Sequence, residues 1–532
     1  MDNEKGRNGL SYGLMLLAMG AGMVLGLAIA QNRFFNRYEQ GSTLGSKVQE
    51  TMALIQGQYV DEVSGDSLTD EMLNAMLNTL DPHSRYLSAE MMAKESEHLQ
   101  GHFDGIGVLL RRVGDTSCVG VVFGDGPSAD AGLLPGDRIV MVDTVPVAER
   151  KTPADEVVKL IRGRRYSTVD IGVVRHGVEG VGHYKIRRGQ VNTHTVNYYA
   201  MLDSRNGYIR ISGFAEHTHK EFCLALSELK KKGMKRLIID LRGNGGGLLE
   251  ASLKIANELL PQGDMIVYTK GRHQRKIDVR STGNGMYTEG DLVVMIDETS
   301  ASASEVLAGA IQDNDRGVIM GRRSFGKGLV QSQFELADGS AIWLTTSRYY
   351  TPSGRCIQKP YTDGYEEYFI SNYQQALAES MSDSIEAHLA DTTRYYTKNG
   401  RVVYGGGGIV PDRVIPHKRY EGILYFNQLS RAMVMYDYAF DYVTRNVKAL
   451  KEKYPTAESF EKGFATTDAM IAEMVTLGVK RQIDRNETST KAYKYLMKST
   501  IKAYVGQCLF GDNLYYKLTI VDDDEIQAAL KG

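Results

Sequence analysis

The stretch RLIIDLRGNGGGLLEASLKIANELL (residues 236–260) decides the fold class, because it joins a buried strand to an amphipathic helix through a glycine-rich loop. The run Arg236 to Leu241 is apolar enough for a buried strand, and Leu248 to Leu260 repeats apolar residues at helical spacing. A second buried strand, Leu292 to Asp297, is likewise followed by a helical pattern. Such short strand–helix units predict a mostly parallel or mixed sheet with helices packed on it.

The length and the charge of the chain limit the number of domains and the class of partner that can be expected. At 532 residues the chain is longer than one hydrophobic core usually grows, so several folding units are expected. It carries 63 basic and 65 acidic residues, and this balance gives no indication of a nucleic-acid partner. A neutral polypeptide substrate is compatible with it.

The N-terminus departs from the globular pattern. Leu10 to Ala30 carries no charge and is long enough to cross a hydrocarbon layer of about 30 Å. The basic residues before it favour a cytoplasmic N-terminus (1–9) and a chain exported to the periplasmic side of the inner membrane. A cleaved signal peptide is the alternative, since Ala28-Ile29-Ala30 has the small-x-small form of a cleavage site.

Cysteine and histidine spacing predicts neither a metal site nor a cofactor. The four cysteines, Cys118, Cys223, Cys356 and Cys508, are widely separated and form no CxxC pair. The eleven histidines contain no HExxH pattern, and His217 and His219 are interpreted as surface polar residues before a helix.

From Gly101 the sequence pattern changes to short runs typical of β-strands, with one clear helical pattern at Pro153 to Ile161. At the start of this β domain, glycines precede a strand in a pattern suited to receive the terminal carboxylate of a peptide that adds to the sheet edge. The candidate peptide-binding residues are Phe103, Gly105, Ile106, Gly107 and Val108. A glycine turn without a ligand is the alternative.

Ser302 lies where a buried strand ends and a helix begins, a common place for catalytic groups. The helix N-terminus there offers free N–H groups to a developing oxyanion, although a serine in this position also serves as an ordinary helix cap. Lys327, between two glycines and before an apolar strand, is the candidate base, with an ordinary surface lysine as the alternative. The glycine-rich loop Arg242 to Gly247 lacks the GKS or GKT ending of a phosphate-binding loop, which argues against nucleotide binding. An oxyanion hole and a plain turn remain as interpretations.

Taken together, several ordered segments resemble the carboxyl-terminal processing peptidases, or tail-specific proteases, a family of serine peptidases with a PDZ domain. The segments are LDPHSRYL, FDGIGV, GPSADAGLLPGDRIV, IIDLRGNGGG, TSASASE, SFGKGLVQ, TTSRYYTPSGR and GGIVPD, between about residues 45 and 417. The resemblance implies that Ser302 is the nucleophile and Lys327 its general base, with Gln331 holding the lysine. It further implies oxyanion donors at the backbone N–H groups of Gly246 and Ala303.

The resemblance also implies a multidomain α+β chain with a crotonase/ClpP-like α/β protease core and an inserted PDZ domain. The expected regions are a cytoplasmic N-terminus 1–9, a membrane anchor or signal sequence 10–30, an N-terminal helical region 31–100, a PDZ domain 101–190, the protease core 191–358, a helical insertion 359–404, a return to the core 405–417, and a C-terminal helical region 418–532.

The function implied is a serine endopeptidase that recognises the C-terminal tails of exported or misfolded proteins through its PDZ domain. A catalytically silent, peptide-binding scaffold is the alternative. An adaptor protein and a homo-oligomer are left open as partners. Two residues stand apart: Cys356, where many relatives have serine, raises the question of a second nucleophile, and Asp313 matches a family position with a structural or catalytic role.

Overall fold

The computed structural model describes residues 43–113, 116–124, 126–148, 152–362, 364–370, 392–416 and 423–531. The predicted membrane segment, residues 10–30, lies outside these ranges. Within them, no helix is both long and apolar enough to cross a bilayer. The chain divides into two compact units, Met1–Leu77 and Asn78–Gly532.

The described part of the first unit is helical, as expected for the N-terminal helical region 31–100. It contains α2 (Thr43–Gln58) and most of α3 (Gly65–Asn78). Met52 and Ile55 of α2 line a shallow hollow together with Leu68 and Met72 of α3. The two helices therefore share one apolar surface, the arrangement expected from apolar residues at helical spacing.

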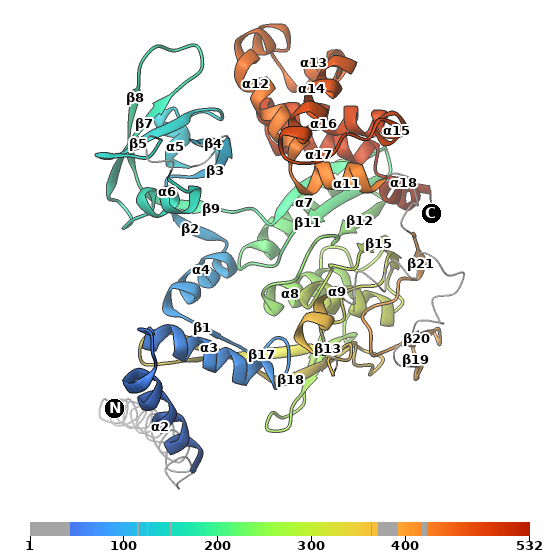
Figure 1. Cartoon of the computed structure of the whole chain (residues 1–532). Coiled ribbons are helices and arrows are strands. Elements are labelled where there is room, and N and C mark those ends of the chain that lie inside the picture. Colours follow the sequence, from blue (N-terminus) through green and yellow to red (C-terminus); the bar gives the residue numbers. More distant parts are fainter. Residues whose placement is uncertain are drawn as a thin grey trace, which may run out of the picture. The chain divides into compact units, whose positions relative to one another are not determined.

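The second unit is built on a six-stranded mixed sheet in the order β10-β11-β12-β15-β16-β21 (Figure 1). Only β10 and β11 are antiparallel, and the remaining neighbours are parallel. The strands are β10 (Val196–Met201), β11 (Asn206–Ile211), β12 (Arg236–Asp240), β15 (Asp291–Ile296), β16 (Val318–Gly321) and β21 (Arg413–Val414). The sequence prediction of a mostly parallel or mixed sheet is confirmed.

Helices cover both faces of this sheet, which explains why its strands are continuously apolar. Leu237 and Ile239 of β12 face the core shared by α7 (Thr218–Lys231), α8 (Leu249–Leu259) and α9 (Ala303–Asp313). Ile238, between them, belongs to the opposite core, which includes Ile520 and Ile526 from the C-terminal helices.

A second, antiparallel sheet closes the core on the side of the candidate site. Its order is β1-β18-β13-β14, and β17 also pairs with β18. The strands are β1 (Arg85–Leu87), β13 (Met265–Lys270), β14 (Ile277–Arg280), β17 (Leu329–Glu335) and β18 (Ala341–Tyr350).

One of these strands lies in the region 31–100 that was expected to be helical. Residues 85–87, in the LDPHSRYL segment, form β1, which pairs antiparallel with β18 with Arg85 opposite Trp343. A three-residue strand carries almost no periodic signal, and its partner lies far along the chain, so local pattern could not reveal it. The helix α4 (Ala89–Gln100) follows directly.

The β-rich region forms its own sheet, in the order β3-β4-β5-β7-β8 with β6 beside β5. The elements are β3 (Val108–Val113), β4 (Thr116–Val122), α5 (Pro127–Ala131), β5 (Arg138–Val142), β6 (Val145–Pro146), α6 (Ala154–Ile161), β7 (Thr168–Val174) and β8 (Gly182–Arg187). The predicted helix is α6. The chain enters and leaves this sheet through a paired ribbon, β2 (His102–Gly105) with β9 (Gly189–Asn192).

Beyond residue 422 the described chain is helical and forms a separate apolar core. The helices are α11 (Ile423–Arg431), α12 (Val434–Lys453), α13 (Ala457–Gly463), α14 (Asp468–Lys480), α15 (Glu487–Ala492), α16 (Lys494–Phe510), α17 (Asp512–Val521) and α18 (Asp524–Lys531).

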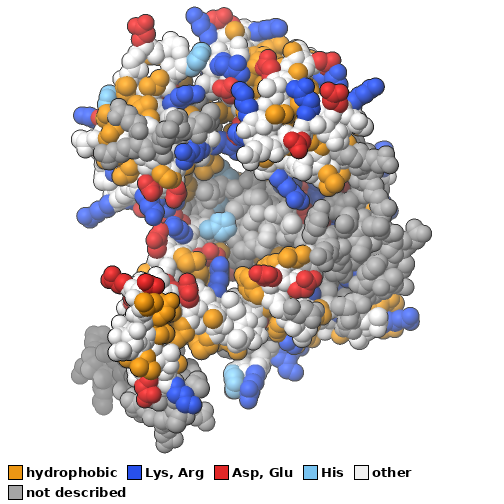
Figure 2. Space-filling view, viewed as in Figure 1, with side chains coloured by type: hydrophobic (Ala, Val, Ile, Leu, Met, Phe, Trp, Pro, Cys, Tyr) orange, Lys and Arg blue, Asp and Glu red, His pale blue; other side chains and the backbone are white. Residues whose placement is uncertain are grey.

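On the face seen in Figure 2, acidic and basic side chains are interspersed, in keeping with the formal net charge of −2.

The predicted helical insertion, residues 359–404, is only partly described. Its end forms a β-hairpin of β19 (Arg394–Tyr396) and β20 (Val402–Tyr404) rather than a helix. The helix prediction is therefore wrong for these residues. The physical reason is that Asn399-Gly400 makes a turn, with Gly400 at φ +83°, and the tyrosines and valines on either side favour strands.

Candidate active site

A cavity of about 520 Å³ lies between the glycine loop after β12, the start of α9, and strand β17. Four of the residues singled out from the sequence line it: Ser302, Lys327, Gln331 and Gly246. Arg85 and His98 line it as well, so the LDPHSRYL segment and α4 contribute to its wall. The tertiary fold thus brings together residues that are widely separated in the sequence.

The three serines of the SASAS segment differ in what their hydroxyls bind. Ser300 Oγ donates to the carbonyl oxygen of Leu241 (2.9 Å), and Ser304 Oγ donates to that of Asn244 (2.9 Å). Both of these serines are fully buried. Of the three, Ser302 alone lines the cavity. The outer two serines fasten the start of α9 to the neighbouring glycine loop and leave the middle one facing the open space.

Ser302 has an unusual backbone conformation, with φ 54° and ψ −113°. Positive φ is uncommon for a residue with a Cβ, and it persists where surrounding contacts hold it. Its N–H donates to Glu305 Oε2 (2.8 Å), and its carbonyl oxygen accepts from the Tyr349 hydroxyl (3.3 Å). A serine held on a sharp strand-to-helix turn presents its hydroxyl to the cavity.

Glu305 links the serine loop to the lysine loop and was not singled out from the sequence. It is fully buried. Its Oε2 accepts from the N–H groups of Ser302 (2.8 Å) and Lys327 (2.9 Å). Its Oε1 accepts from Ser324 Oγ (2.5 Å) and the Gly326 N–H (2.7 Å). Burial raises the pKa of Glu305 to about 7, although these four donors act in the opposite direction.

Lys327 has an environment that disfavours its charge. Burial, together with the nearby Arg85 guanidinium, lowers the pKa of Lys327 from 10.5 to about 8. Glu305 opposes that shift. A lysine with a pKa near 8 is neutral in a substantial fraction of molecules at neutral to mildly alkaline pH, so it can accept a proton there.

Another lysine, Lys359, is buried beside the same loop and is held differently. Burial lowers the pKa of Lys359 to about 8 as well. Its Nζ lies over the rings of Phe325 (4.2 Å) and Tyr368 (4.1 Å) and donates to the Tyr368 carbonyl oxygen (2.5 Å). Lys359 is not among the cavity-lining residues. Its ammonium group is committed to the aromatic cluster, whereas Lys327 faces the cavity.

Gln331 lies on β17 in the cavity wall, and a hydrogen bond to the neighbouring strand orients its side chain. Its Nε2 donates to Thr345 Oγ1 (3.1 Å) on the paired strand β18. The Thr345 N–H donates to Ser84 Oγ (3.0 Å), and Ser84 Oγ donates to Asp81 (2.7 Å). The LDPHSRYL segment therefore supports the strand pair that carries Gln331.

The two predicted oxyanion donors are placed differently. Ala303 is the first residue of α9, next to Ser302 at the helix N-terminus. Gly246 packs against this turn, since a Cβ built on it would lie 2.9 Å from the Ala301 carbonyl oxygen. The Gly246 N–H, however, donates to Asn244 Oδ1 (2.8 Å). For Gly246 to stabilise an oxyanion, its N–H must first leave Asn244.

The loops around the cavity are also connected to the C-terminal helices through a charge network that local sequence patterns did not indicate. Arg242, at the start of the glycine loop, binds the buried Asp240 (2.7 Å) and makes two hydrogen bonds to Asp523 (2.9 and 3.1 Å). Glu525 bridges Arg242 (3.2 Å) and Arg322. Arg322 in turn binds Glu298 (2.7 Å), in the loop that leads to Ser302.

The candidate peptide-binding residues lie on β2 and in the turn that leads into an edge strand, β3. β3, which begins at Val108, is an edge strand paired only with β4 in its sheet, and α6 packs near it. Gly107 has φ +79°, and a Cβ there would lie 3.1 Å from Gly126. Ile106 is buried in the domain core, and its carbonyl oxygen accepts from the Ser128 N–H (2.8 Å). Gly105 ends β2, which also contains Phe103.

Of the two residues that stood apart in the sequence, Asp313 is buried and Cys356 is half-buried. Asp313 binds Arg355 (2.7 Å), with both side chains fully buried, and accepts from the Ser353 N–H (3.0 Å). It thereby holds the turn of the TPSGR segment. Burial raises the pKa of the Cys356 thiol, and Cys356 does not line the cavity. These observations favour a structural Asp313 and an unreactive Cys356.

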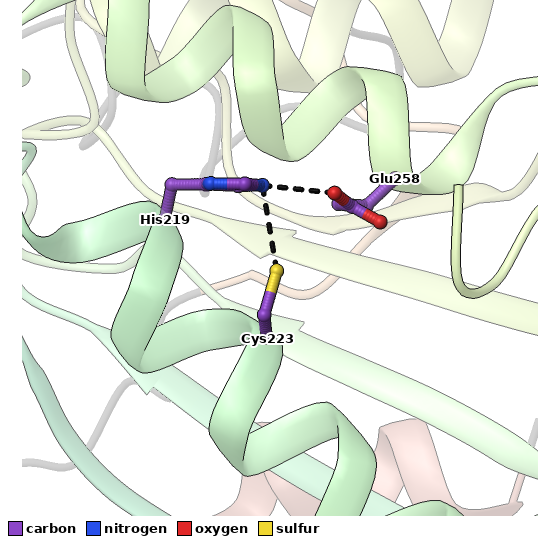
Figure 3. Close-up of side chains that lie close together, drawn as sticks. All are labelled: His219, Cys223 and Glu258. Carbon is purple, nitrogen blue, oxygen red and sulfur yellow. Dashed lines mark hydrogen bonds and ion pairs between the residues drawn. The ribbon is translucent and has the colours of Figure 1, made fainter. Parts of the chain in front are cut away.

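Away from the cavity, the described residues include one cluster of potential metal ligands, which joins α7 to α8 (Figure 3). It consists of His219, Cys223 and Glu258, whose ligand atoms lie within 4.8 Å of one another. The sequence interpretation compared His219 with His217 and found no ligand set. The signal that it missed is the spacing of His219 and Cys223, four residues apart on one helix.

Comparison with protein families matches three parts of the chain. Residues 205–365 match peptidase family S41, residues 122–175 match a PDZ domain, and residues 425–511 match a family of unknown function. The first match covers most of the core sheet, from β11 to β16, and the second covers the separate β sheet from β5 to β7. The third covers most of the C-terminal helices.

Individual relatives extend this similarity. A carboxy-terminal-processing protease of Bartonella bacilliformis is 33% identical over 341 residues, covering 63% of this chain and 76% of that protein. The carboxy-terminal processing protease CtpA of Bacillus subtilis is 28% identical over 460 residues, covering 86% and 91%. Among solved structures, a photosystem II D1 C-terminal processing protease is 28% identical with a TM-score of 0.34, covering 59% of this chain and 90% of that one.

Proposed function

Because the chain belongs to peptidase family S41 and is a carboxy-terminal-processing, serine-type peptidase, we propose that it cleaves polypeptides with a Ser302–Lys327 dyad. The observation that carries this proposal is the shared cavity, which Ser302 and Lys327 both line. Ser300 and Ser304 have their hydroxyls engaged by carbonyl groups. The pKa of Lys327 is lowered toward the range in which a neutral amine is available.

In the proposed reaction, Ser302 Oγ attacks the scissile carbonyl carbon while neutral Lys327 accepts the hydroxyl proton. The Ala303 N–H at the start of α9 stabilises the oxyanion, joined by Gly246 if its N–H leaves Asn244. As the peptide bond breaks, Lys327 returns the proton to the leaving amine, and an acyl-enzyme remains on Ser302. Water, deprotonated by Lys327, then hydrolyses this ester.

The dyad is tested by cleavage of an unfolded polypeptide with the purified full chain. Ser302→Ala and Lys327→Met are each expected to abolish detectable product while keeping the wild-type circular dichroism spectrum. Cys356→Ser is the matched control and is expected to cleave normally. Wild-type cleavage by Ser302→Ala, or loss of cleavage in Cys356→Ser alone, would contradict the assignment.

We further propose that the PDZ domain captures substrate C-termini on the free edge of β3, beside α6. An edge strand offers unpaired N–H and C=O groups to an added strand, and the turn at Gly107 leads directly into it. In this arrangement Gly105 to Val108 lie near the terminal carboxylate.

Peptide binding is measured by fluorescence anisotropy in the Ser302→Ala background, which prevents cleavage. A peptide with a free apolar C-terminus is expected to bind at least about tenfold more tightly than the same peptide with an amidated C-terminus, because amidation removes the charge that backbone N–H groups receive. Equal affinity for the two peptides would argue against recognition of the tail.

The natural substrates proposed are exported or misfolded proteins, and the proposed location is the periplasmic side of the inner membrane. The uncharged stretch 10–30 supports export. Comparing the C-termini of exported proteins in cells with wild-type or Ser302→Ala protein tests both points. If the chain were only a binding scaffold, the two sets of C-termini would be the same.

A further inference from the structure

Three side chains with metal-binding atoms converge where α7 packs on α8, outside the candidate active site (Figure 3). His219 and Cys223 project from the same side of α7, and Glu258 reaches them from near the end of α8. Residues four apart on a helix lie one above the other, so the first two ligands share a face by helix geometry alone. The third comes from a different helix, which makes the cluster a tertiary feature.

Two of the three distances between ligand atoms are close to those of a tetrahedral zinc site, and the third, between Cys223 Sγ and the Glu258 carboxylate, is within 4.8 Å. His219 Nε2 lies 2.9 Å from Glu258 Oε1 and 3.4 Å from Cys223 Sγ. Zinc bonds of roughly 2.0–2.1 Å to nitrogen or oxygen and about 2.3 Å to sulfur would place these atoms roughly 3.3–3.6 Å apart. Relative to His219 Nε2, the Glu258 oxygen and the Cys223 sulfur would each have to move by only a few tenths of an ångström to reach these separations.

Contacts behind the cluster already orient one of its ligands. The second carboxylate oxygen of Glu258 accepts from the Met286 N–H (2.9 Å), and the Glu258 carbonyl oxygen accepts from the Tyr287 N–H (2.9 Å). Such outer hydrogen bonds orient the ligating carboxylate in metal sites. The helices themselves are anchored in the core through buried residues such as Phe222 and Ile255.

We propose that His219, Cys223 and Glu258 bind one Zn²⁺ ion, with water in the fourth position. On binding, the Cys223 S–H bond breaks, the thiolate sulfur coordinates the metal, and the proton passes to solvent. All three residues are partly exposed, so the ion and its water can reach the site from solvent. The proposal adds a site to the chain and does not depend on the proposed dyad.

The ligand types select zinc among common divalent ions. Calcium and magnesium prefer oxygen ligands and would gain only one carboxylate here. A thiolate, an imidazole and a carboxylate together suit Zn²⁺, which readily adopts the tetrahedral arrangement these positions allow. Cobalt(II) adopts the same geometry and serves as a coloured substitute.

The site would act on structure rather than on the chemical step. Glu258 lies one residue before the end of α8, and that helix begins at Leu249, two residues after Gly247, the last residue of the glycine loop. At about 1.5 Å per residue, the site is roughly 14 Å along the helix from this loop. Zinc would fasten α7 to α8 and so restrain the helix that follows Gly246 and Gly247.

Without metal, the His219–Glu258 contact is an ordinary ion pair or hydrogen bond, and this is the competing explanation. Titration of the full chain with Co²⁺ separates the two. The metal site predicts a thiolate-to-cobalt charge-transfer absorption band that saturates at one equivalent and is abolished by added Zn²⁺. A simple His–Glu contact predicts no such band.

The variants identify the ligands. Cys223→Ser is expected to abolish the band, and His219→Asn and Glu258→Gln to weaken Co²⁺ binding at least about tenfold. Cys356→Ser and His273→Asn, which change a distant thiol and an exposed imidazole, are the matched controls and should bind as the wild type does. Folding of each variant is checked by circular dichroism. If one of the three ligand variants misfolds, the other two still test whether these residues bind the metal.

Zn²⁺ is also expected to raise the melting temperature of the wild type and of both controls, but not of Cys223→Ser. A wild-type chain without a charge-transfer band, or a band that survives in Cys223→Ser, overturns the proposal.

Discussion

At the scale of single residues, the proposed chemistry depends on the charge of Lys327. Only its neutral form can accept the Ser302 proton, and its pKa is lowered to about 8. The neutral fraction therefore falls about tenfold for each pH unit below 7. We predict that kcat declines with this slope between pH 7 and pH 5.5, as measured by initial rates on one peptide substrate. A constant kcat across that range would exclude Lys327 as the base.

A matched variant separates this effect from titration of Glu305, whose pKa is raised to about 7 by burial. The Glu305 carboxylate favours the charged form of Lys327. Glu305→Gln removes that charge, so the pKa of Lys327 should fall further and the acid limb of the profile should move to lower pH. An acid limb that disappears in this variant would instead assign the limb to Glu305.

Glu305 itself is predicted to be a positioning residue, since it touches both loops but does not line the cavity. In Glu305→Gln the side chain keeps one oxygen acceptor, and an NH₂ group replaces the other oxygen. The donors that now bind the replaced oxygen would lose their acceptor. We expect kcat to fall about 10²-fold, with a smaller effect on KM, because small misplacements of reacting groups have effects of this size. Stability should fall by about 1–3 kcal/mol in chemical denaturation.

Glu250→Gln is the control for this variant, because Glu250 is exposed and forms an ion pair with Lys254 on the same helix. It should change stability by less than about 0.5 kcal/mol. If Glu305→Gln kept the wild-type kcat, the serine and lysine loops would have to hold their positions without it.

At the scale of elements, the glycine loop and the start of α9 are packed too closely to accept a side chain at Gly246. Its φ is +105°, and a Cβ would lie 2.9 Å from both the Ala301 carbonyl oxygen and Ser302 Cβ. Gly246→Ala is expected to lower the free energy of unfolding by about 1–3 kcal/mol and to reduce kcat by displacing Ser302.

Gly245→Ala, one residue earlier, is the matched comparison. A Cβ at Gly245 meets no atom within 4 Å, and its φ is not in the left-handed region. Its unfolding free energy should lie within about 0.5 kcal/mol of the wild type. Equal destabilisation by the two substitutions would show that loop flexibility, rather than contact with the serine turn, determines the effect.

At the scale of the whole molecule, the C-terminal helices contribute to the active-site loops. Asp523 and Glu525 bind Arg242, and Glu525 also binds Arg322. These arginines flank the glycine loop and the lysine loop in the sequence. We predict that the double variant Asp523→Asn/Glu525→Gln lowers kcat at least about tenfold, because it leaves Arg242 with Asp240 alone and Arg322 with Glu298 alone as counter-charges and loosens both loops.

The measurement compares kcat of this double variant with that of Glu487→Gln, an exposed acidic residue in the first turn of α15. Both proteins are first shown to melt cooperatively. An unchanged kcat in the folded double variant would limit the C-terminal helices to a role in stability or in binding other molecules.

Local pattern predicted much of the fold. The buried strand at 236–240 and the helix after it were found within one residue, since a continuous apolar run and a helical repeat are local signals. Strand β1 and the hairpin at 394–404 were missed. β1 is three residues long and depends on a partner strand far along the chain, and the hairpin lies in a polar, tyrosine-rich segment with weak alternation.

The sequence by itself determined the strand–loop–helix core, the edge-strand glycines and the ordered motifs that single out Ser302 and Lys327, because these are properties of neighbouring residues. The tertiary structure decided which groups meet. It engages Ser300 and Ser304 with carbonyls of another loop, makes Glu305 an acceptor for both the serine loop and the lysine loop, connects Asp523 to Arg242, and sets Cys223 beside Glu258. Sheet order and helix packing determine these partners. They bring together residues that are far apart in the sequence, and the local sequence around one residue does not indicate its partner.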